Sequence, residues 1–263
     1  MAEPQDGPPA ALFRFFERLP RQGPGSAALT AAIFERVRPR LPAGPVVADM
    51  GCGSGAAGLV LARLLAGESL LDDQGARVHG VDIHPPFLRA FEAAAAEAGL
   101  AGRIDTRCAS MLETGWPDGC LDLVWSEGAV FTVGFDAALV EFARLLKSGG
   151  VTVISEATWF QDPARAPAEL RAFWHANYAG MRTVAGNLAA AEAQGWRFLH
   201  AERLADAVWE SAFYAPMERL IAALRAAGET DLLAIAAESE REIALFRRHS
   251  AFYGYVYYAL ERD

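Results

Sequence analysis

The chain contains 263 residues, of which 52% are hydrophobic and 22% are charged, proportions typical of a globular protein with one sizeable core. Its formal net charge of −9 provides no positive field for a phosphate backbone, so nucleic acid is excluded as an expected partner. The start is acidic and proline-rich and no segment offers about 18 uninterrupted apolar residues, so we expect a soluble, cytoplasmic protein without a membrane partner.

Two helices are predicted first, over residues 8–19 and 27–38, with the glycine-rich turn "PRQGPG" between them. From residue 46 onward, short strands alternate with longer helices. Strands are predicted at 46–50, 77–82, 103–108, 121–126 and 151–156, and helices at 56–66, 86–98 and 136–147. This alternation predicts an α/β fold with a doubly wound, mostly parallel sheet that binds ligands at the carboxyl ends of its strands.

The pattern changes after residue 156. Helices are predicted near 165–180 and 183–194, then a strand at "WRFLHAERL", further helix to about 250, and an aromatic strand at "FYGYVYYAL". We expect the two late strands to extend the sheet edge to seven strands, and the helical insertions at about 160–195 and 205–250 to form a cap. Residues 1–45 are then an N-terminal helical lid, and residues 46–263 are the main domain.

The stretch "VVADMGCGSGAAG" fits two ligand-binding patterns at once. Gly53, Gly55 and Gly58 match the dinucleotide pattern G-x-G-x-x-G, whereas Asp49 followed by Gly51, Gly53 and Gly55 matches the D-x-G-x-G-x-G pattern of S-adenosylmethionine sites. Asp49 favours the second pattern, because its carboxylate would repel a pyrophosphate but attract an ammonium group.

The position of the next acidic residue also separates the two patterns. A dinucleotide site needs an acid about 20 residues further on, and Asp72 and Asp73 have that spacing but lie in an expected surface loop. Asp82 ends the second predicted strand, where its carboxylate can accept hydrogen bonds from both ribose hydroxyls. A plain strand-end role for Asp82 remains the alternative.

The order of "VVADMGCGSG", the acid at the end of strand two, "CASML" and "LDLVWSEGAV" resembles class I S-adenosylmethionine-dependent methyltransferases. "RQGPGS", "WSEGAVF" and "SEATWF" resemble a branch related to the quinone-biosynthesis type of small-molecule methyltransferases. The resemblance implies a Rossmann-like fold and S-adenosylmethionine as cofactor. It implies contacts from Arg21, Gln22, Asp49, Gly51, Gly53, Gly55, Asp82, Ile83, Ser110, Met111 and Ser126.

Two of these contacts are more specific. Ser110 and Met111 are expected to border the adenine, although many relatives carry Asp where Ser110 stands, so a weaker or water-mediated contact is expected there. Arg21 or Gln22 is expected to reach the carboxylate of the methionine moiety, with a simple turn between helices as the alternative.

Glu127 and Glu156 are the candidate general bases, because they end two predicted strands that are neighbours in such a sheet. We expect both carboxylates to point into one cleft, where their repulsion would raise at least one pKa. The alternative is that each caps a helix or pairs with an arginine. His175 is a third candidate base, with packing or surface exposure as its alternative.

No metal is expected, although two carboxylates at strand ends can begin a magnesium site. Metal-dependent catechol-type enzymes carry an Asp and an Asp-Asn pair where this chain has Ser-Glu twice. Cys52, Cys108 and Cys120 lack the close pairing of a zinc site and are expected to be reduced thiols.

Aromatic residues near strand ends and in the expected cap are candidates for binding an apolar or planar small molecule. They are Trp125, Phe131, Trp159, Trp174, Tyr178, Trp209 and Tyr214, and plain core packing is the alternative for each. The sequence therefore predicts methyl transfer to a small-molecule acceptor. A non-catalytic S-adenosylmethionine-binding protein and a nicotinamide-dependent oxidoreductase are the alternatives, and the acceptor, the methylated atom and the oligomeric state are open.

Overall fold

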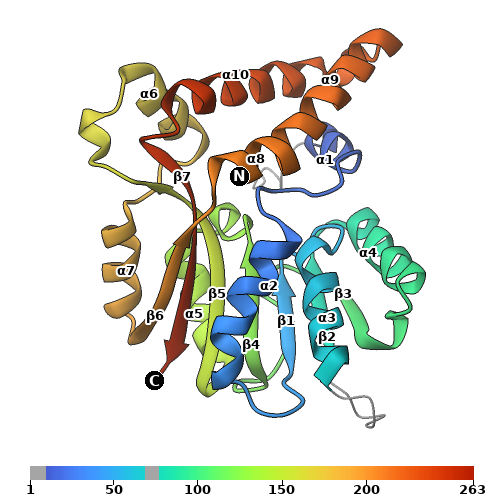
Figure 1. Cartoon of the computed structure of the whole chain (residues 1–263), viewed down its shortest axis with the longest axis vertical. Helices are drawn as coiled ribbons and strands as arrows, with labels where there is room; N and C mark the ends of the chain where they lie inside the picture. Colours follow the sequence, from blue (N-terminus) through green and yellow to red (C-terminus); the bar gives the residue numbers. More distant parts are fainter. Residues whose placement is uncertain (1–9, 69–76) are drawn as a thin grey trace, which may run out of the picture.

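A computed structural model describes residues 10–68 and 77–263 of the chain (Figure 1). Its seven-stranded sheet has the order β3-β2-β1-β4-β5-β7-β6. The strands are β1 (Val47–Met50), β2 (Val78–Asp82), β3 (Ile104–Cys108), β4 (Leu121–Glu127), β5 (Leu146–Trp159), β6 (Trp196–Arg203) and β7 (Tyr253–Arg262). β7 runs antiparallel to both of its neighbours, and the pairs among β1 to β5 are parallel. The predicted fold class is confirmed, including the two late strands at the edge.

Helices cover both faces of this sheet. They are α1 (Ala10–Phe16), α2 (Ala27–Val37), α3 (Ala56–Glu68), α4 (Pro85–Glu97), α5 (Phe135–Leu145), α6 (Ala168–Asn177), α7 (Val184–Glu192), α8 (Asp206–Trp209), α9 (Ala215–Ala227) and α10 (Leu233–His249). Side chains of α2 and α3 pack in one buried cluster, and those of α5 and α7 pack in another on the opposite face. We call the first the front face and the second the back face.

The cap, which we define as α6 and α8–α10, lies beyond the carboxyl ends of the parallel strands, and α1 lies beside it (Figure 1). Its interior is aromatic: Trp209 contacts the rings of Tyr214, Phe246, Tyr253 and Tyr255. The long predicted helix up to residue 250 is divided, because a π-helical turn at Glu210–Tyr214 and a short 3-10 turn at Thr230–Leu232 interrupt it. Among the described residues, no helix has the length and apolar character needed to cross a membrane.

The strand predicted at 151–156 is longer than expected, and this changes the geometry of the site. β5 continues to Trp159, and its last nine residues each pair with a residue of β7. All residues from Gly150 to Trp159 are buried, which explains the continuous pairing. Glu156 therefore lies within the strand, opposite Val256, rather than at its end.

Some predictions concern residues that the structure does not describe. Asp72 and Asp73 lie outside the described residues, as do positions 8 and 9 of the first predicted helix, which is described from Ala10 to Phe16.

Candidate active site

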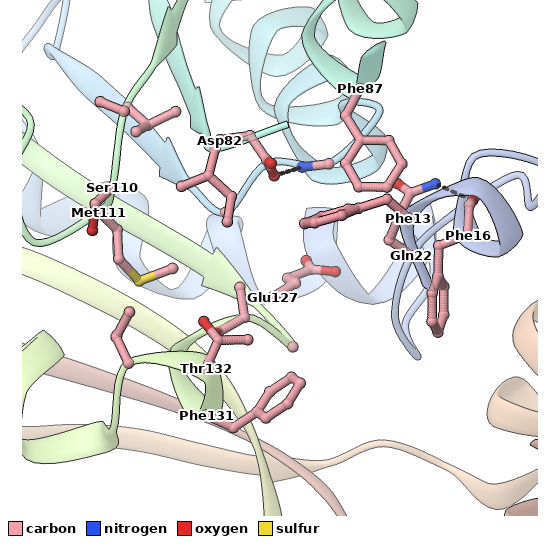
Figure 2. Close-up of a pocket in the computed structure, with 18 of the residues that line it drawn as sticks. Phe13, Phe16, Gln22, Asp82, Phe87, Ser110, Met111, Glu127, Phe131 and Thr132 are labelled. Atoms are coloured by element: carbon pink, nitrogen blue, oxygen red, sulfur yellow. Dashed lines mark hydrogen bonds between the residues drawn. The ribbon is translucent and has the colours of Figure 1, made fainter. Parts of the chain in front are cut away.

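A cavity of about 400 Å³ opens at the carboxyl ends of β1, β2 and β4 (Figure 2). Its walls come from the glycine loop after β1, the ends of β2 and β4, the segments after β3 and β4, and α1. Phe13 and Phe16 approach from α1, while Asp82 and Met111 lie across the cavity from them (Figure 2). A smaller adjoining cavity of about 30 Å³ continues past Asp49 and Cys52.

The glycine loop brings backbone to the cavity wall because its glycines adopt backbone angles that other residues avoid. Gly51, Gly53 and Gly55 have φ values of 70°, 52° and 85°. A Cβ atom at Gly53 would lie 2.5 Å from Oε1 of Gln22, so a side chain there would have to displace Gln22. The loop therefore leaves main-chain atoms at the cavity.

Asp82 joins the glycine loop to the end of β2. Its Oδ2 accepts a hydrogen bond from the Gly53 amide and its Oδ1 accepts one from the His84 amide, both at 2.9 Å. Burial raises the pKa of Asp82, and these amide hydrogen bonds oppose the rise. Asp82 lines the cavity, and a carboxylate oxygen can accept more than one hydrogen bond, so Asp82 has capacity left for the two hydroxyls of a ribose.

Asp49 is buried beside the smaller cavity, with 1% of its surface exposed, and its Oδ2 has no hydrogen-bond partner. Burial, helped by the nearby charge of Glu127, raises the pKa of Asp49 to about 8. A buried carboxyl without a partner is costly, and a cationic donor reaching Oδ2 would offset that cost. The residues present therefore fit a ligand that brings an ammonium group to this point.

Glu127 lines both cavities, but its oxygens already have partners. Oε1 accepts hydrogen bonds from Thr30 Oγ1 at 2.6 Å and from Trp125 Nε1 at 3.0 Å, and Oε2 accepts one from Arg21 at 3.0 Å. Glu127 and Arg21 keep only 6% and 12% of their side-chain surfaces exposed. The structure thus supports the alternative in which this glutamate pairs with an arginine.

The expectation that Glu127 and Glu156 share one cleft is wrong. β4 and β5 are neighbours, but Glu127 pairs in register with Ser155, and side chains alternate between the faces of a strand. Glu127 therefore lies on the front face with Trp125, whereas Glu156 lies on the back face with Ile154. Burial rather than repulsion between the two carboxylates raises the pKa of Glu156, to about 8.

The segment before α2, which contains Arg21 and Gln22, forms hydrogen bonds with the glycine loop. Gln22 Oε1 accepts hydrogen bonds from the amide and hydroxyl of Ser54, and Gln22 Nε2 donates to the carbonyls of Phe16 and Leu19. Arg21 donates to Glu127 and to the Gly23 carbonyl. Both side chains are therefore fixed at the smaller cavity, where one of them was expected to bind the carboxylate of the methionine moiety.

Comparison with known proteins finds similarity to methyltransferases. Residues 48–154 match the family model described as "Methyltransferase domain". The chain is 34% identical over 127 residues to dimethylglycine N-methyltransferase of Parasynechococcus marenigrum, which covers 48% of this chain and 40% of that protein. It is 31% identical over 137 residues to 2-methyl-6-phytyl-1,4-hydroquinone methyltransferase of Synechocystis, covering 51% and 37%.

A solved structure extends the likeness to the whole fold. An S-adenosylmethionine-dependent methyltransferase from Geobacter sulfurreducens, in complex with S-adenosylhomocysteine, superposes with a TM-score of 0.78 at 20% identity, covering 97% of this chain and 99% of that one. Residues 48–154 are therefore similar to methyltransferase domains, and the chain shares the fold of an S-adenosylmethionine-dependent methyltransferase. Its alignments with the two curated relatives span only about two fifths of their lengths, 40% and 37%.

Several predicted site residues line the main cavity, namely Gln22, Gly51, Gly53, Asp82, Ile83, Ser110, Met111, Glu127 and Phe131. Others do not. Ser126 is fully buried and donates its hydroxyl to the Met50 carbonyl, and Trp125 is fully buried beneath Glu127. Neither lines the cavities described above, so the structure does not support contact with cofactor or acceptor for either residue.

The cap residues also fall outside the main cavity. Trp159, Trp174, His175 and Tyr178 line a separate open groove, where His175 is exposed. Trp209 and Tyr214 are core residues of the cap. Only Tyr178 is linked to the main cavity, because its ring packs edge-on against Phe131 with the ring centres 5.9 Å apart.

Sequence reasoning missed several contributors to the site, among them Thr30, His84, Phe87 and Thr132. Phe87 is in the first turn of the helix after β2, and only this position in the sequence could have indicated that it lines the cavity. Thr30 donates a hydrogen bond to Glu127 from a helix 97 positions earlier in the sequence, and no local pattern predicts such a contact. Among residues 10–68 and 77–263, no group of three or more His, Cys, Asp or Glu side chains is arranged to hold a metal ion.

Proposed function

We propose that this protein transfers a methyl group from S-adenosylmethionine to a small-molecule acceptor. The observation that carries this proposal is the buried Asp49 carboxyl, whose Oδ2 lacks a partner at the cavity beside the glycine loop. The ammonium group of a methionine moiety supplies both the charge and the donors that this oxygen needs. A dinucleotide would bring a negatively charged pyrophosphate to the same place.

The other cofactor contacts follow from the geometry of the cavity. Asp82 would accept hydrogen bonds from the ribose hydroxyls through the lone pairs that Gly53 and His84 leave free. Ser110 and Met111 would border the adenine, with Ile83 on the same wall. Arg21 and Gln22 would close the methionine end, and Glu127 would position Arg21 rather than act as a base.

The acceptor side of the cavity is apolar. Phe13, Phe16, Phe87 and Phe131 all contribute to its walls, which suits an apolar or planar molecule. Bound S-adenosylmethionine supplies a methyl group on a sulfonium centre. The chain's own task is then mainly to align the acceptor and exclude water, for which effective molarities on the order of 10⁵ M or more are known.

Residues 1–45 would act as a lid, because α1 contributes Leu12, Phe13 and Phe16 to the cavity and must move if ligands are to exchange. We also propose a cytoplasmic location, which agrees with the three free cysteines, Cys52, Cys108 and Cys120.

A product-mass screen tests the proposed function. The protein is incubated with a metabolite extract and S-adenosylmethionine carrying an isotope-labelled methyl group. We expect at least one product with the labelled methyl mass and stoichiometric S-adenosylhomocysteine, and the Asp49→Ala variant is the control that should form neither. Cofactor binding without any labelled product would favour a non-catalytic binding protein instead.

A further inference from the structure

Glu156 is a buried carboxyl that the proposed cofactor site does not use. Only 1% of its surface is exposed, and neither of its oxygens makes a well-formed hydrogen bond. The Tyr178 hydroxyl approaches closely enough to lower the carboxyl's pKa, but burial dominates. Buried polar groups in native proteins are nearly always hydrogen-bonded, so this unfilled capacity is evidence for a missing partner.

The charges around Glu156 indicate what kind of partner fits. The positive charge of Arg182 lowers the pKa of Glu156, but the Arg182 guanidinium is already paired with both oxygens of Asp136, at 2.7 and 2.5 Å. With its pKa raised to about 8, the Glu156 carboxyl is largely protonated near neutral pH. A protonated carboxyl donates one hydrogen bond and accepts others, as does a neutral hydroxyl group.

Tyr178 places this carboxyl next to the acceptor side of the cavity. The Tyr178 ring packs edge-on against Phe131, and Phe131 lines the cavity with 40% of its surface exposed (Figure 2). On its other side, Tyr178 lines the open groove under α6, together with Trp159 and Trp174. Tyr178 therefore contacts Phe131 of the cavity wall with its ring and approaches Glu156 with its hydroxyl, although Glu156 itself lines neither space.

We propose that Tyr178 and Glu156 form a recognition site for a hydroxyl group of the methyl acceptor. This inference rests on the proposed methyl transfer and narrows it to acceptors that carry a hydroxyl group on an apolar or planar body. The ring or chain of the acceptor lies against Phe131, and its hydroxyl completes the hydrogen bonding of the tyrosine and the carboxyl.

The cap contains a matched pair that serves as a control. Tyr214 donates its hydroxyl to Glu242 Oε1 at 2.8 Å, and burial raises the pKa of Glu242 to about 7. Unlike Tyr178, Tyr214 does not line the groove under α6, and neither member of this pair lines the main cavity. Substitutions in this pair remove the same chemical groups from a buried place that no acceptor is proposed to reach.

The experiment measures weak binding of two probes, benzyl alcohol and toluene, to the full chain saturated with S-adenosylhomocysteine. The probes share an aromatic ring and differ in the hydroxyl. Glu156→Gln and Tyr178→Phe should each weaken benzyl alcohol binding about threefold to tenfold, the usual range for one lost hydrogen bond, and leave toluene binding unchanged. Glu242→Gln and Tyr214→Phe should change neither affinity.

Three results would overturn the inference while the cofactor still binds. In the first, the wild-type protein binds neither probe. In the second, the variants at Glu156 and Tyr178 keep full affinity for benzyl alcohol. In the third, these variants lose affinity for both probes equally, which would indicate that the two residues only contribute packing. Wild-type protein that fails to bind S-adenosylhomocysteine would instead overturn the proposed function, and this inference with it.

Discussion

Glu127 and Glu156 occupy adjacent strands of the same sheet yet have opposite surroundings. Glu127, on the front face, accepts hydrogen bonds from Arg21, Thr30 and Trp125. Glu156, on the back face, is buried without a well-formed hydrogen bond. The difference arises because their positions in register differ by one residue, and a single residue turns a side chain to the other face of a sheet. A carboxylate whose oxygens all have hydrogen-bond partners stabilises the fold. A carboxyl without such partners can still form hydrogen bonds with a ligand.

Removing the front carboxylate should have the largest effect on stability. Glu127→Ala leaves the buried guanidinium of Arg21 without its partner, together with the Thr30 hydroxyl and the Trp125 indole N–H. We expect a loss of about 3 to 5 kcal/mol in the free energy of unfolding, the usual cost of breaking a buried ion pair. Urea denaturation measures it, and Glu127→Gln, which keeps the shape and the acceptor oxygen, should lose less. Equal losses below about 1 kcal/mol would show that the network contributes little.

Removing the Asp82 carboxylate, the proposed ribose contact, should weaken binding of the cofactor. Asp82→Ala should weaken S-adenosylhomocysteine affinity by roughly 1.5 to 3 kcal/mol, the range for hydrogen bonds to a charged group. Isothermal titration calorimetry gives the value, and Asp105→Ala on β3, whose carboxylate contacts the His79 ring, is a control that should bind normally. Wild-type affinity in Asp82→Ala would place the ribose contact elsewhere.

The back carboxyl should make stability depend on pH. The folded-state pKa of Glu156 is raised to about 8 from an ordinary value of 4.5, so the native state binds a proton that the unfolded state has released. Its contribution is therefore greatest below about pH 4.5 and is lost as pH rises toward about 8. The charged and titratable groups near it are Tyr178, Arg182, Asp136, Tyr255 and Tyr258.

Glu156→Gln removes this titration. Between about pH 6 and pH 8, wild-type protein should lose about 1 to 2 kcal/mol more unfolding free energy than the variant does, since one pKa unit corresponds to about 1.4 kcal/mol. Urea denaturation at the two pH values supplies the comparison. Asp49 and Glu242, whose pKa values are also raised, titrate in both proteins and cancel. Parallel losses would show that Glu156 keeps an ordinary pKa.

The smallest expected effect concerns α1, which approaches the front face. Phe13 stacks on His84 with the ring centres 4.2 Å apart, and Glu17 lies 2.6 Å from the His84 ring. If residues 1–45 act as a lid, ligand binding should slow amide hydrogen exchange in α1, while exchange in α7, far from the cavity, stays unchanged. Exchange measured with and without S-adenosylhomocysteine checks this, and equal rates in α1 would indicate a rigid, open cavity.

The sequence predicted the fold well because its signals are local. The glycine loop, the acid at the end of β2 and the alternation of strands with helices each lie within short segments, and all three appear in the structure. The placement of Glu127 and Glu156 depended on register and on the true length of β5, which extends to Trp159 because β7 pairs with it from about 100 residues away. Two of the three partners of Glu127, Arg21 and Thr30, come from α2 and the turn before it, so no neighbouring pattern indicated them.

The aromatic residues show the same limit. Trp125, Trp209 and Tyr214 are aromatic residues of the kind that often line binding sites, but they are buried in the core. Phe131, in contrast, faces the cavity. A sequence gives the spacing of aromatic residues, but which of them faces a cavity depends on how the cap packs on the sheet.

Calorimetric titration of the wild-type protein with S-adenosylhomocysteine, and separately with NADH, decides which class of ligand the glycine loop binds. We expect one S-adenosylhomocysteine site per chain, lost in Gly53→Val because a side chain at that glycine collides with Gln22, and no measurable binding of NADH. Binding of NADH in place of S-adenosylhomocysteine, or a folded Gly53→Val variant that binds S-adenosylhomocysteine as tightly as the wild type, would contradict this expectation.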